Sequence, residues 1–321
     1  MSRRVRGVLS RVAMTTALAC RPEPLASPPG SDEAEASGAA VSEPDGPGRL
    51  HVGGSTLTVV YEGRELPVPA AATETWVRRS SSMIADYLGG FPVPGLEITL
   101  VGRGGGGVGF GLHQDGRWIT VYCGRRLSEA GLEDDWVMVH EMLHAAFPDL
   151  AVEHRWMQEG LSTYVEPIVR ARAGNTSDEQ VWKRWTRSMR YGRPQDGDRG
   201  LDLTHTWGRT YWGGALFWMM VDVELRSRTN NERSIRDVMR GILAEGGNGR
   251  ANWSTERVVE VGDAATGTTV LRELYAAMAR APGDIDLEEL YAELGVQRID
   301  GEVFFDDDAP LAHVRRAITR P

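Results

Sequence analysis

A pattern with a histidine at each end, His140-Glu141-Met142-Leu143-His144, constrains this chain more than any other feature of its sequence. Residues four apart on an α-helix are turned by only about 40°, so both imidazoles project from one face with the glutamate beside them. Apolar neighbours, among them Trp136 and Val139, extend a buried helix over Leu132–Ala146, where unpartnered histidines would be costly. The pattern therefore predicts a metal-binding helix. The alternative is a helix whose histidines pack in the core or face solvent.

Zinc is the metal that such a helix favours. The neutral imidazole nitrogens of His140 and His144 are good Zn²⁺ ligands. Glu141 lies beside their face, where it can hold and deprotonate a water that the metal activates, rather than bind the metal itself. A catalytic zinc also needs a third protein ligand and an open fourth position. Chemistry alone leaves both His154 and Glu159 open as that ligand.

The segment that follows the histidine helix narrows the choice. Trp156 to Glu166 reads W-x-x-E-G-x-x-x-Y-x-E. An H-E-x-x-H helix followed by this pattern resembles the gluzincin metallopeptidases, whose third zinc ligand is the glutamate before the glycine. The resemblance implies that Glu159 is the third ligand, because His154 lies outside the family pattern. It also implies a thermolysin-like zinc peptidase domain.

A tyrosine further along the chain extends the resemblance. Arg209 to Ala215 reads R-T-Y-W-G-G-A, which is similar to the Y-x-x-G-A segment of the aminopeptidase N-like and glycyl aminopeptidase families. Asp222–Arg226 and Ser234–Met239 are similar to the glycyl aminopeptidases in particular. In these families the tyrosine donates a hydrogen bond to the tetrahedral oxyanion, which implies that role for Tyr211. The alternative is a core tyrosine that begins an apolar helix.

Departures from these families concern specificity. Their aminopeptidases hold the free amine of the substrate with an acid in a glycine-rich edge strand, and the corresponding stretch here, Gly107 to His113, has no acid. The choice between aminopeptidase and endopeptidase therefore stays open. The interval from His144 to Glu159 is also shorter than is usual for aminopeptidase N-like enzymes. A PDZ-like module is not expected, since the tail after Gly249 is predicted to be mostly helical.

Other polar residues are weaker candidates for the site. Glu166 and Thr163 could accept the second N–H of a ligating histidine, or could be ordinary capping or surface groups. Asp202 and His205 are expected in a solvated loop rather than in the cleft. The acidic run at 306–308 lacks the spacing of metal ligands, and it predicts a solvated turn rather than a calcium site.

The hydrophobic pattern changes along the chain from strands to helices. Up to residue 127 it alternates, which predicts strands such as Leu96–Val101 and Trp118–Cys123 and one covering helix, Thr73–Leu88. We therefore expect an α+β protein, in which a small mixed sheet (49–127) precedes a mainly helical zinc-binding catalytic subdomain (128–247). Residues 248–321 are expected to form a helical extension.

The N-terminus favours export. Residues 1–20 combine a basic segment with a short apolar stretch that ends at Cys20, which is similar to a bacterial lipobox; the alternative is a disordered basic N-terminus. The stretch 21–48, rich in Pro, Ser and Ala, predicts a disordered tether. We expect a secreted, periplasmic or cell-envelope protein with a lipid anchor at Cys20. Cys123 then has no partner, which predicts no disulfide and a buried place in a strand.

Charge and motifs together define the expected activity and partners. The net charge of −9 argues against nucleic acid, and membrane contact is expected only through the Cys20 anchor. We expect a zinc-dependent peptidase that uses metal-activated water on peptides or proteins outside the cytoplasm. The alternatives are a catalytically inactive gluzincin-fold lipoprotein that serves as a binding module, and a metallohydrolase with other substrates. The sequence leaves the substrate sequence and the oligomeric state open. The expected zinc ligands are His140, His144 and Glu159, the general base is Glu141, and the oxyanion donor is Tyr211.

Overall fold

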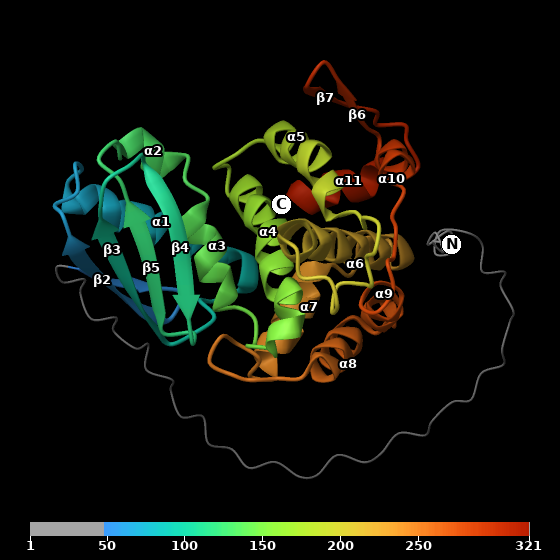
Figure 1. Cartoon of the computed structure of the whole chain (residues 1–321), viewed down its shortest axis with the longest axis horizontal. Coiled ribbons are helices and arrows are strands. Elements are labelled where there is room, and N and C mark those ends of the chain that lie inside the picture. Colours follow the sequence, from blue (N-terminus) through green and yellow to red (C-terminus); the bar gives the residue numbers. More distant parts are fainter. Residues whose placement is uncertain (1–47, 321) are drawn as a thin grey trace, which may run out of the picture.

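The computed structural model describes residues 48–320, with a sheet at one end of the molecule and a helical body at the other (Figure 1). The predicted signal segment with Cys20, and the tether up to residue 47, lie outside the described residues. Within 48–320, no helix combines the length and the apolar composition that crossing a bilayer requires. The α+β expectation is confirmed, because the strands of the main sheet come first and the helices follow.

Five strands form one mixed sheet in the order β1-β2-β3-β5-β4. They are β1 (Arg49–Val52), β2 (Ser55–Gly63), β3 (Gly95–Gly102), β4 (Val108–Gln114) and β5 (Trp118–Cys123). The three central strands are parallel, whereas β1 and β4 pair antiparallel with their neighbours and form the two edges. Leu57, Ile98 and Val121 are fully buried, as alternation predicts for a face that helices cover. Most of the glycine-rich stretch 107–113 thus lies in the edge strand β4.

α1 (Ala70–Leu88) and α3 (Val137–His144) connect the sheet to the helical body, because each contacts both a strand of the sheet and α4 (Arg155–Arg172). α1 ends at Gly89, whose φ of 88° gives the left-handed cap that glycine adopts easily. The single helix expected over 132–146 is wrong, because α2 (Glu129–Glu133) and α3 are separate. The Asp135 carboxylate causes the break. It accepts hydrogen bonds from the backbone N–H groups of Val137 and Met138 at 3.1 and 2.9 Å, which satisfies the first donors of α3.

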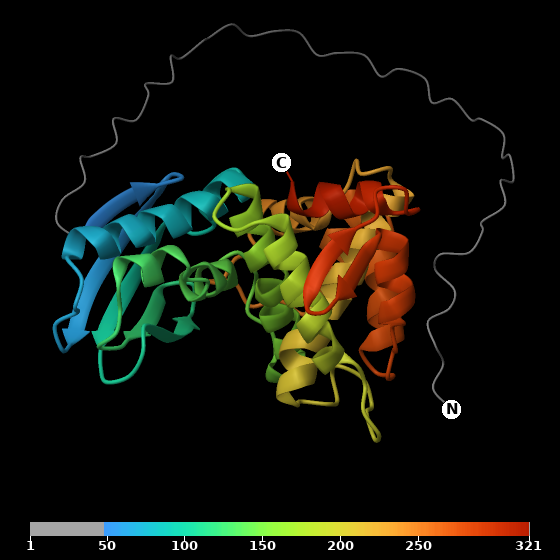
Figure 2. The same cartoon turned by 90° about the horizontal axis from the view of Figure 1, so that it is seen from above.

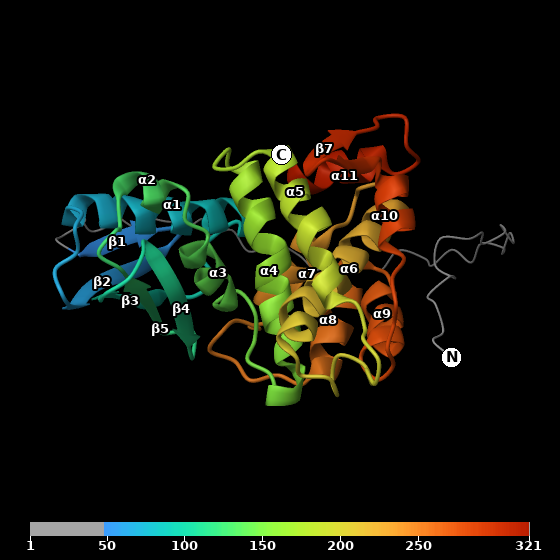
Figure 3. The ribbon, with the colours of Figure 1, turned by 45° about the horizontal axis from the view of Figure 1, so that its top comes forward.

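The helical body is built around α6, which is buried from Gly214 to Arg226. α4 packs against both α3 and α6, and Figures 2 and 3 show it between the sheet and the C-terminal helices. Short helical turns precede α4 (η1, Val152–His154), follow α5 (η2, Met189–Gly192) and precede α6 (η3, Gly208–Gly213). The helices of the body are α4 (Arg155–Arg172), α5 (Asp178–Ser188), α6 (Gly214–Arg228), α7 (Ile235–Ala244), α8 (Thr255–Thr266), α9 (Val270–Met278), α10 (Leu287–Leu294) and α11 (Ala312–Thr319).

The C-terminal region is mostly helical, as expected, but it also has strands that the sequence interpretation did not predict. It contains a hairpin of β6 (Val296–Ile299) and β7 (Glu302–Phe305). Asp300 and Gly301 join the strands with φ angles of 51° and 89°, and a two-residue hairpin turn of this kind requires positive φ at both positions. The acidic run at 306–308 follows the hairpin and is exposed, as expected for a solvated turn.

Candidate metal centre

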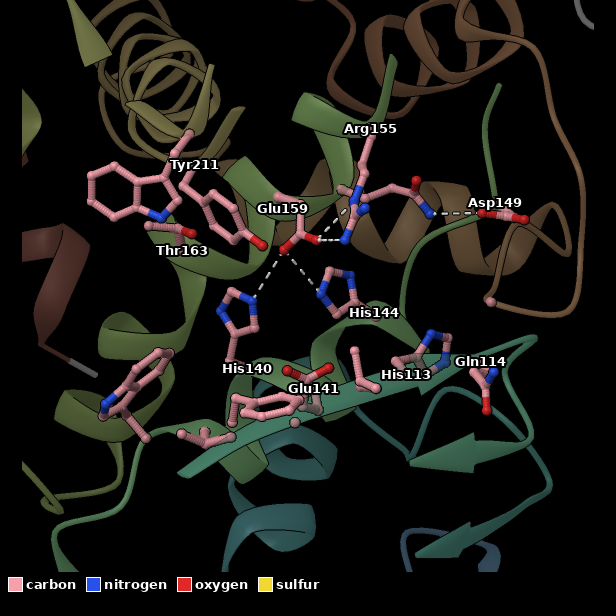
Figure 4. A pocket seen from close by; sticks show the side chains of 18 of the residues that line it. His113, Gln114, His140, Glu141, His144, Asp149, Arg155, Glu159, Thr163 and Tyr211 are labelled. Atoms are coloured by element: carbon pink, nitrogen blue, oxygen red, sulfur yellow. Dashed lines mark hydrogen bonds and ion pairs between the residues drawn. The ribbon is translucent and has the colours of Figure 1, made fainter. Parts of the chain in front are cut away.

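Two histidines of α3 and one glutamate of α4 converge at a single point. His140 Nε2 lies 3.4 Å and His144 Nε2 lies 3.5 Å from the same oxygen, Glu159 Oε2. One ligand atom from each residue lies within 4.8 Å of the other two, and the three side chains are at most 10% exposed. Figure 4 shows the three side chains pointing toward one another from their two helices.

This arrangement fits a zinc ion. Bonds of about 2.0–2.2 Å to a tetrahedral zinc place neighbouring ligand atoms about 3.3–3.6 Å apart, and the two contacts of Glu159 Oε2, at 3.4 and 3.5 Å, fall in this range. Two imidazole nitrogens and one carboxylate oxygen are a donor set that zinc uses in catalytic sites. All three residues line one pocket of about 860 Å³. The centre is therefore open on one side.

Arg155 holds the other oxygen of Glu159. Its Nε and Nη2 donate to Glu159 Oε1 at 3.1 and 2.8 Å, which leaves Oε2 to the histidines. Burial alone would raise the pKa of Glu159, but hydrogen bonds from His140 and His144 outweigh it and hold the pKa well below its usual value. Glu159 is therefore a carboxylate, the form that binds a metal. In the sequence, the only sign of the ion pair between Arg155 and Glu159 is their spacing of four residues.

Glu141 lies against the edge strand β4. A Cβ on Gly111 would come within 2.3 Å of Glu141 Cγ, so only glycine leaves room for this side chain. The backbone N–H of His113, two residues further along β4, donates a hydrogen bond to the carboxylate. Burial raises the pKa of Glu141 to about 7, although the neighbouring His144 opposes the shift. The glycine-rich strand thus positions a carboxylate whose pKa suits proton transfer near neutrality.

Tyr211 reaches the centre because α4 and α6 cross at very short range. A Cβ on Gly160 would lie 2.4 Å from Gly214 Cα, so no side chain separates the two backbones. Tyr211 belongs to η3, a π-helical turn directly before α6, and its side chain points toward the Glu159 carboxylate (Figure 4). Burial, and then the charge of Glu159, raises the pKa of Tyr211 to about 12. The hydroxyl therefore stays protonated and can donate a hydrogen bond.

The rival ligand His154 is engaged elsewhere. Its Nδ1 lies 2.8 Å from Asp202 Oδ1. Asp202 is not a solvated loop residue as expected, because it is buried and also accepts hydrogen bonds from Trp156 Nε1 and Tyr275 Oη, both at 2.9 Å. It joins the start of α4 to α9. His205 is exposed, in agreement with the expectation.

The interpretation of Glu166 as a partner of a ligating histidine is wrong. Glu166 is fully buried, and its two oxygens pair with Arg170 Nη1 at 3.2 Å and Arg184 Nη1 at 2.6 Å. Among the described residues, His140 Nδ1 has no hydrogen-bond partner. Thr163 is buried and lines the pocket.

His113 is a pocket residue that the sequence interpretation missed. Its ring stacks on that of His144, with centroids 5.7 Å apart and planes inclined by 26°. Burial, and then the charge of His144, lowers the pKa of His113 to about 3, so its imidazole is neutral. The signal available in the sequence was a histidine at the end of a glycine-rich stretch.

Comparisons with known proteins agree on the fold. No protein-family model matches the sequence, and no curated protein matches it. Among solved structures, an aminopeptidase N family protein from Idiomarina loihiensis is similar with a TM-score of 0.62 at 17% identity, over 82% of this chain and 52% of that one. An M1 zinc metallopeptidase from Deinococcus radiodurans has a TM-score of 0.49 at 17% identity, over 74% of this chain and 53% of that one. The chain thus spans about half the length of these structures, and the first of them shows that its fold is that of an aminopeptidase N family protein, as the resemblance implied.

Proposed function

We propose that this chain is a zinc-dependent peptidase that hydrolyses peptide bonds outside the cytoplasm. The observation that carries the proposal is the convergence of His140, His144 and Glu159 at tetrahedral spacing on the wall of an open pocket. Glu141 and Tyr211 line the same pocket. A purely structural zinc site would be closed by a fourth ligand and would have no use for either residue.

The residues around the pocket divide the chemistry among them. When bound, zinc supplies Lewis acidity, which polarises a peptide carbonyl and lets water attack near neutral pH. Glu141 takes the proton of the attacking water onto its carboxylate and passes it to the nitrogen of the leaving amine. Tyr211 donates a hydrogen bond to the carbonyl oxygen as negative charge develops on it. Arg155 keeps Glu159 Oε2 turned toward the histidines.

The location outside the cytoplasm rests on the sequence. The basic and apolar segment that ends at Cys20 supports export and a lipid anchor. A direct test is to express the full chain with Cys20 or with Cys20→Ser, and to compare membrane fractions after labelling with a palmitate analogue. A label that is absent from both versions would contradict the anchor.

A peptide library separates the proposal from its alternatives. Zinc-loaded protein is incubated with peptides that have free or blocked N-termini, and the cleavage sites are read by mass spectrometry. Cleavage that a chelator abolishes and zinc restores supports the peptidase. Bound zinc without any cleavage favours the inactive binding module, or a hydrolase with other substrates. Cleavage only of peptides with free N-termini identifies an aminopeptidase.

Tyr211→Phe is expected to lower kcat by about a hundredfold to a thousandfold, because one oxyanion donor is lost. The KM and the zinc content should change little, since the ring still packs in place. Steady-state kinetics checks this, with Tyr191→Phe at an exposed tyrosine as the control. A loss of zinc equal to the loss of rate would instead assign Tyr211 to the support of Glu159.

Arg155→Met is expected to weaken zinc binding about tenfold to a hundredfold, as is typical when a residue that orients a ligand is removed. Arg155→Lys, which keeps the charge but loses the paired N–H donors, should fall between this variant and the wild type. Competition with a chromophoric chelator measures the affinity. An unchanged affinity in Arg155→Met would show that Glu159 needs no such support.

Gly111→Ala is expected to lower kcat by about a hundredfold, because a methyl group at this position displaces the Glu141 carboxylate. Zinc content should persist, since the ligands do not touch β4 through this residue. Gly104→Ala is the matched control, because a Cβ there meets no atom within 4 Å. Equal rates for the two variants would contradict the positioning role of β4.

A further inference from the structure

Exposed apolar side chains gather around the pocket of the metal centre. Phe110, Leu112, Trp136, Val152 and Trp207 all line it, with exposed fractions from 42% to 80%. Single exposed apolar side chains are ordinary on protein surfaces, but a group of them at one cleft marks a binding site. The same pocket holds the candidate zinc ligands. The apolar group therefore surrounds the position where a bound substrate would react.

The two tryptophans of this group lie on one side of the centre. The Trp136 ring meets that of His140 edge to face at 5.7 Å, and the Trp207 ring lies 6.2 Å from that of Tyr211. Figure 4 shows Tyr211 and Thr163 beyond His140, whereas His113, Gln114 and Asp149 lie on the opposite side, past His144. The pocket thus has an aromatic half, lined by Trp136, Trp207 and Trp212, and a polar half.

Among the described residues that line it, the aromatic half has no charged side chain free to pair with one of the substrate. Its cation, Arg184, lies over the rings of Trp136 and Trp212 at 5.1 and 5.9 Å, and its charge is already paired with Glu166 at 2.6 Å. A charged substrate side chain would lose its water here without gaining a counter-ion, whereas an apolar side chain would gain by burial. In the polar half, Asp149 accepts a hydrogen bond from Gln158 at 3.1 Å.

We propose that the aromatic half binds a large apolar side chain of the peptide beside the scissile bond. The position follows from the contacts, since Trp136 touches a zinc ligand and Trp207 touches the oxyanion donor. This inference rests on the proposed function because both concern the same pocket. It nevertheless predicts a binding preference that can be measured without hydrolysis.

The test uses the zinc-loaded full chain with Glu141→Gln, in which hydrolysis is blocked. The probes are hexapeptides with a fluorescein-blocked N-terminus and an amidated C-terminus, in which one internal alanine is replaced in turn by Phe, Leu, Gly, Asp or Lys. Fluorescence polarisation gives the Kd. At one internal position or more, the Phe peptide is expected to bind about tenfold to a hundredfold more tightly than the Gly peptide. Trp207→Ala on the same background should shrink this ratio severalfold. Phe304→Ala, at an exposed phenylalanine on β7 outside the pocket, should leave it unchanged.

Several results would overturn the inference. They are equal affinities for the Phe and Gly peptides, a preference for Asp or Lys, and no measurable binding of any peptide. A uniform loss over all five peptides in Trp207→Ala would do so too, because the indole would then act only through Tyr211. Failure of the proposed function would give a different set of results. The wild type would bind zinc and cleave nothing, and the ratio of Phe to Gly affinity would still be measurable.

Discussion

Glu141→Gln should lower kcat for peptide hydrolysis by about a hundredfold to ten-thousandfold, the range expected when a general base is lost. The amide has nearly the shape of the carboxylate, so it still fits against Gly111 and can still accept the N–H of His113. It cannot take a proton from water. Zinc content should remain at the wild-type level, because Glu141 is not a ligand in this arrangement.

The comparison needs a control for the substitution itself. Glu153→Gln makes the same change at an exposed glutamate in η1 and should leave kcat at the wild-type value. Kinetics on one cleavable peptide and metal analysis on the same samples decide the outcome. An unchanged kcat in Glu141→Gln would point to another base, and a loss of zinc would make Glu141 a ligand.

Glu159→Ala should weaken zinc binding by more than about a hundredfold, which exceeds the loss typical of residues that only orient a ligand. The change removes a negatively charged ligand from the buried centre and leaves Arg155, whose side chain is 60% exposed, without its partner. Since bound zinc at a free concentration c stabilises the folded chain by RT ln(1 + c/Kd), the rise in Tm on adding zinc should shrink as well. Chelator competition and thermal unfolding with and without zinc measure the two effects.

His154→Gln is the informative counterpart, because His154 was the chemical rival for the third ligand. Its imidazole is bonded to Asp202, so its replacement should leave the zinc affinity within a few-fold of the wild-type value. The assignment of Glu159 would be wrong if zinc binding survived Glu159→Ala and disappeared in His154→Gln.

Local patterns predicted much of this molecule, because the relevant signals are short in sequence. Strand β5 begins and ends where alternation placed it. The histidine pair depends only on the geometry of one helix. The Asp-Gly pair between β6 and β7 is an equally local signal, because this pair favours a two-residue hairpin turn with positive φ at both positions. The hairpin could therefore have been predicted.

Long-range contacts account for what the sequence interpretation missed. Asp202 receives hydrogen bonds from Trp156 and Tyr275, which are 46 and 73 residues away along the chain. The fit of Gly111 to Glu141 and the stacking of His113 on His144 require the register between β4 and α3. The hydrophobic periodicity of the sequence does not reveal how β4 is aligned with α3. The missed residues are therefore those whose partners lie on another element.

The crossing of α4 and α6 at Gly160 and Gly214 has a consequence for how the centre can change. Backbone meets backbone there, so the spacing of the two segments that carry Glu159 and Tyr211 is set by main-chain atoms, which no side-chain movement at the crossing can adjust. Even one added methyl group would wedge the two helices apart. Metal retention and turnover would then decline together, because both depend on the same rigid contact between α4 and α6.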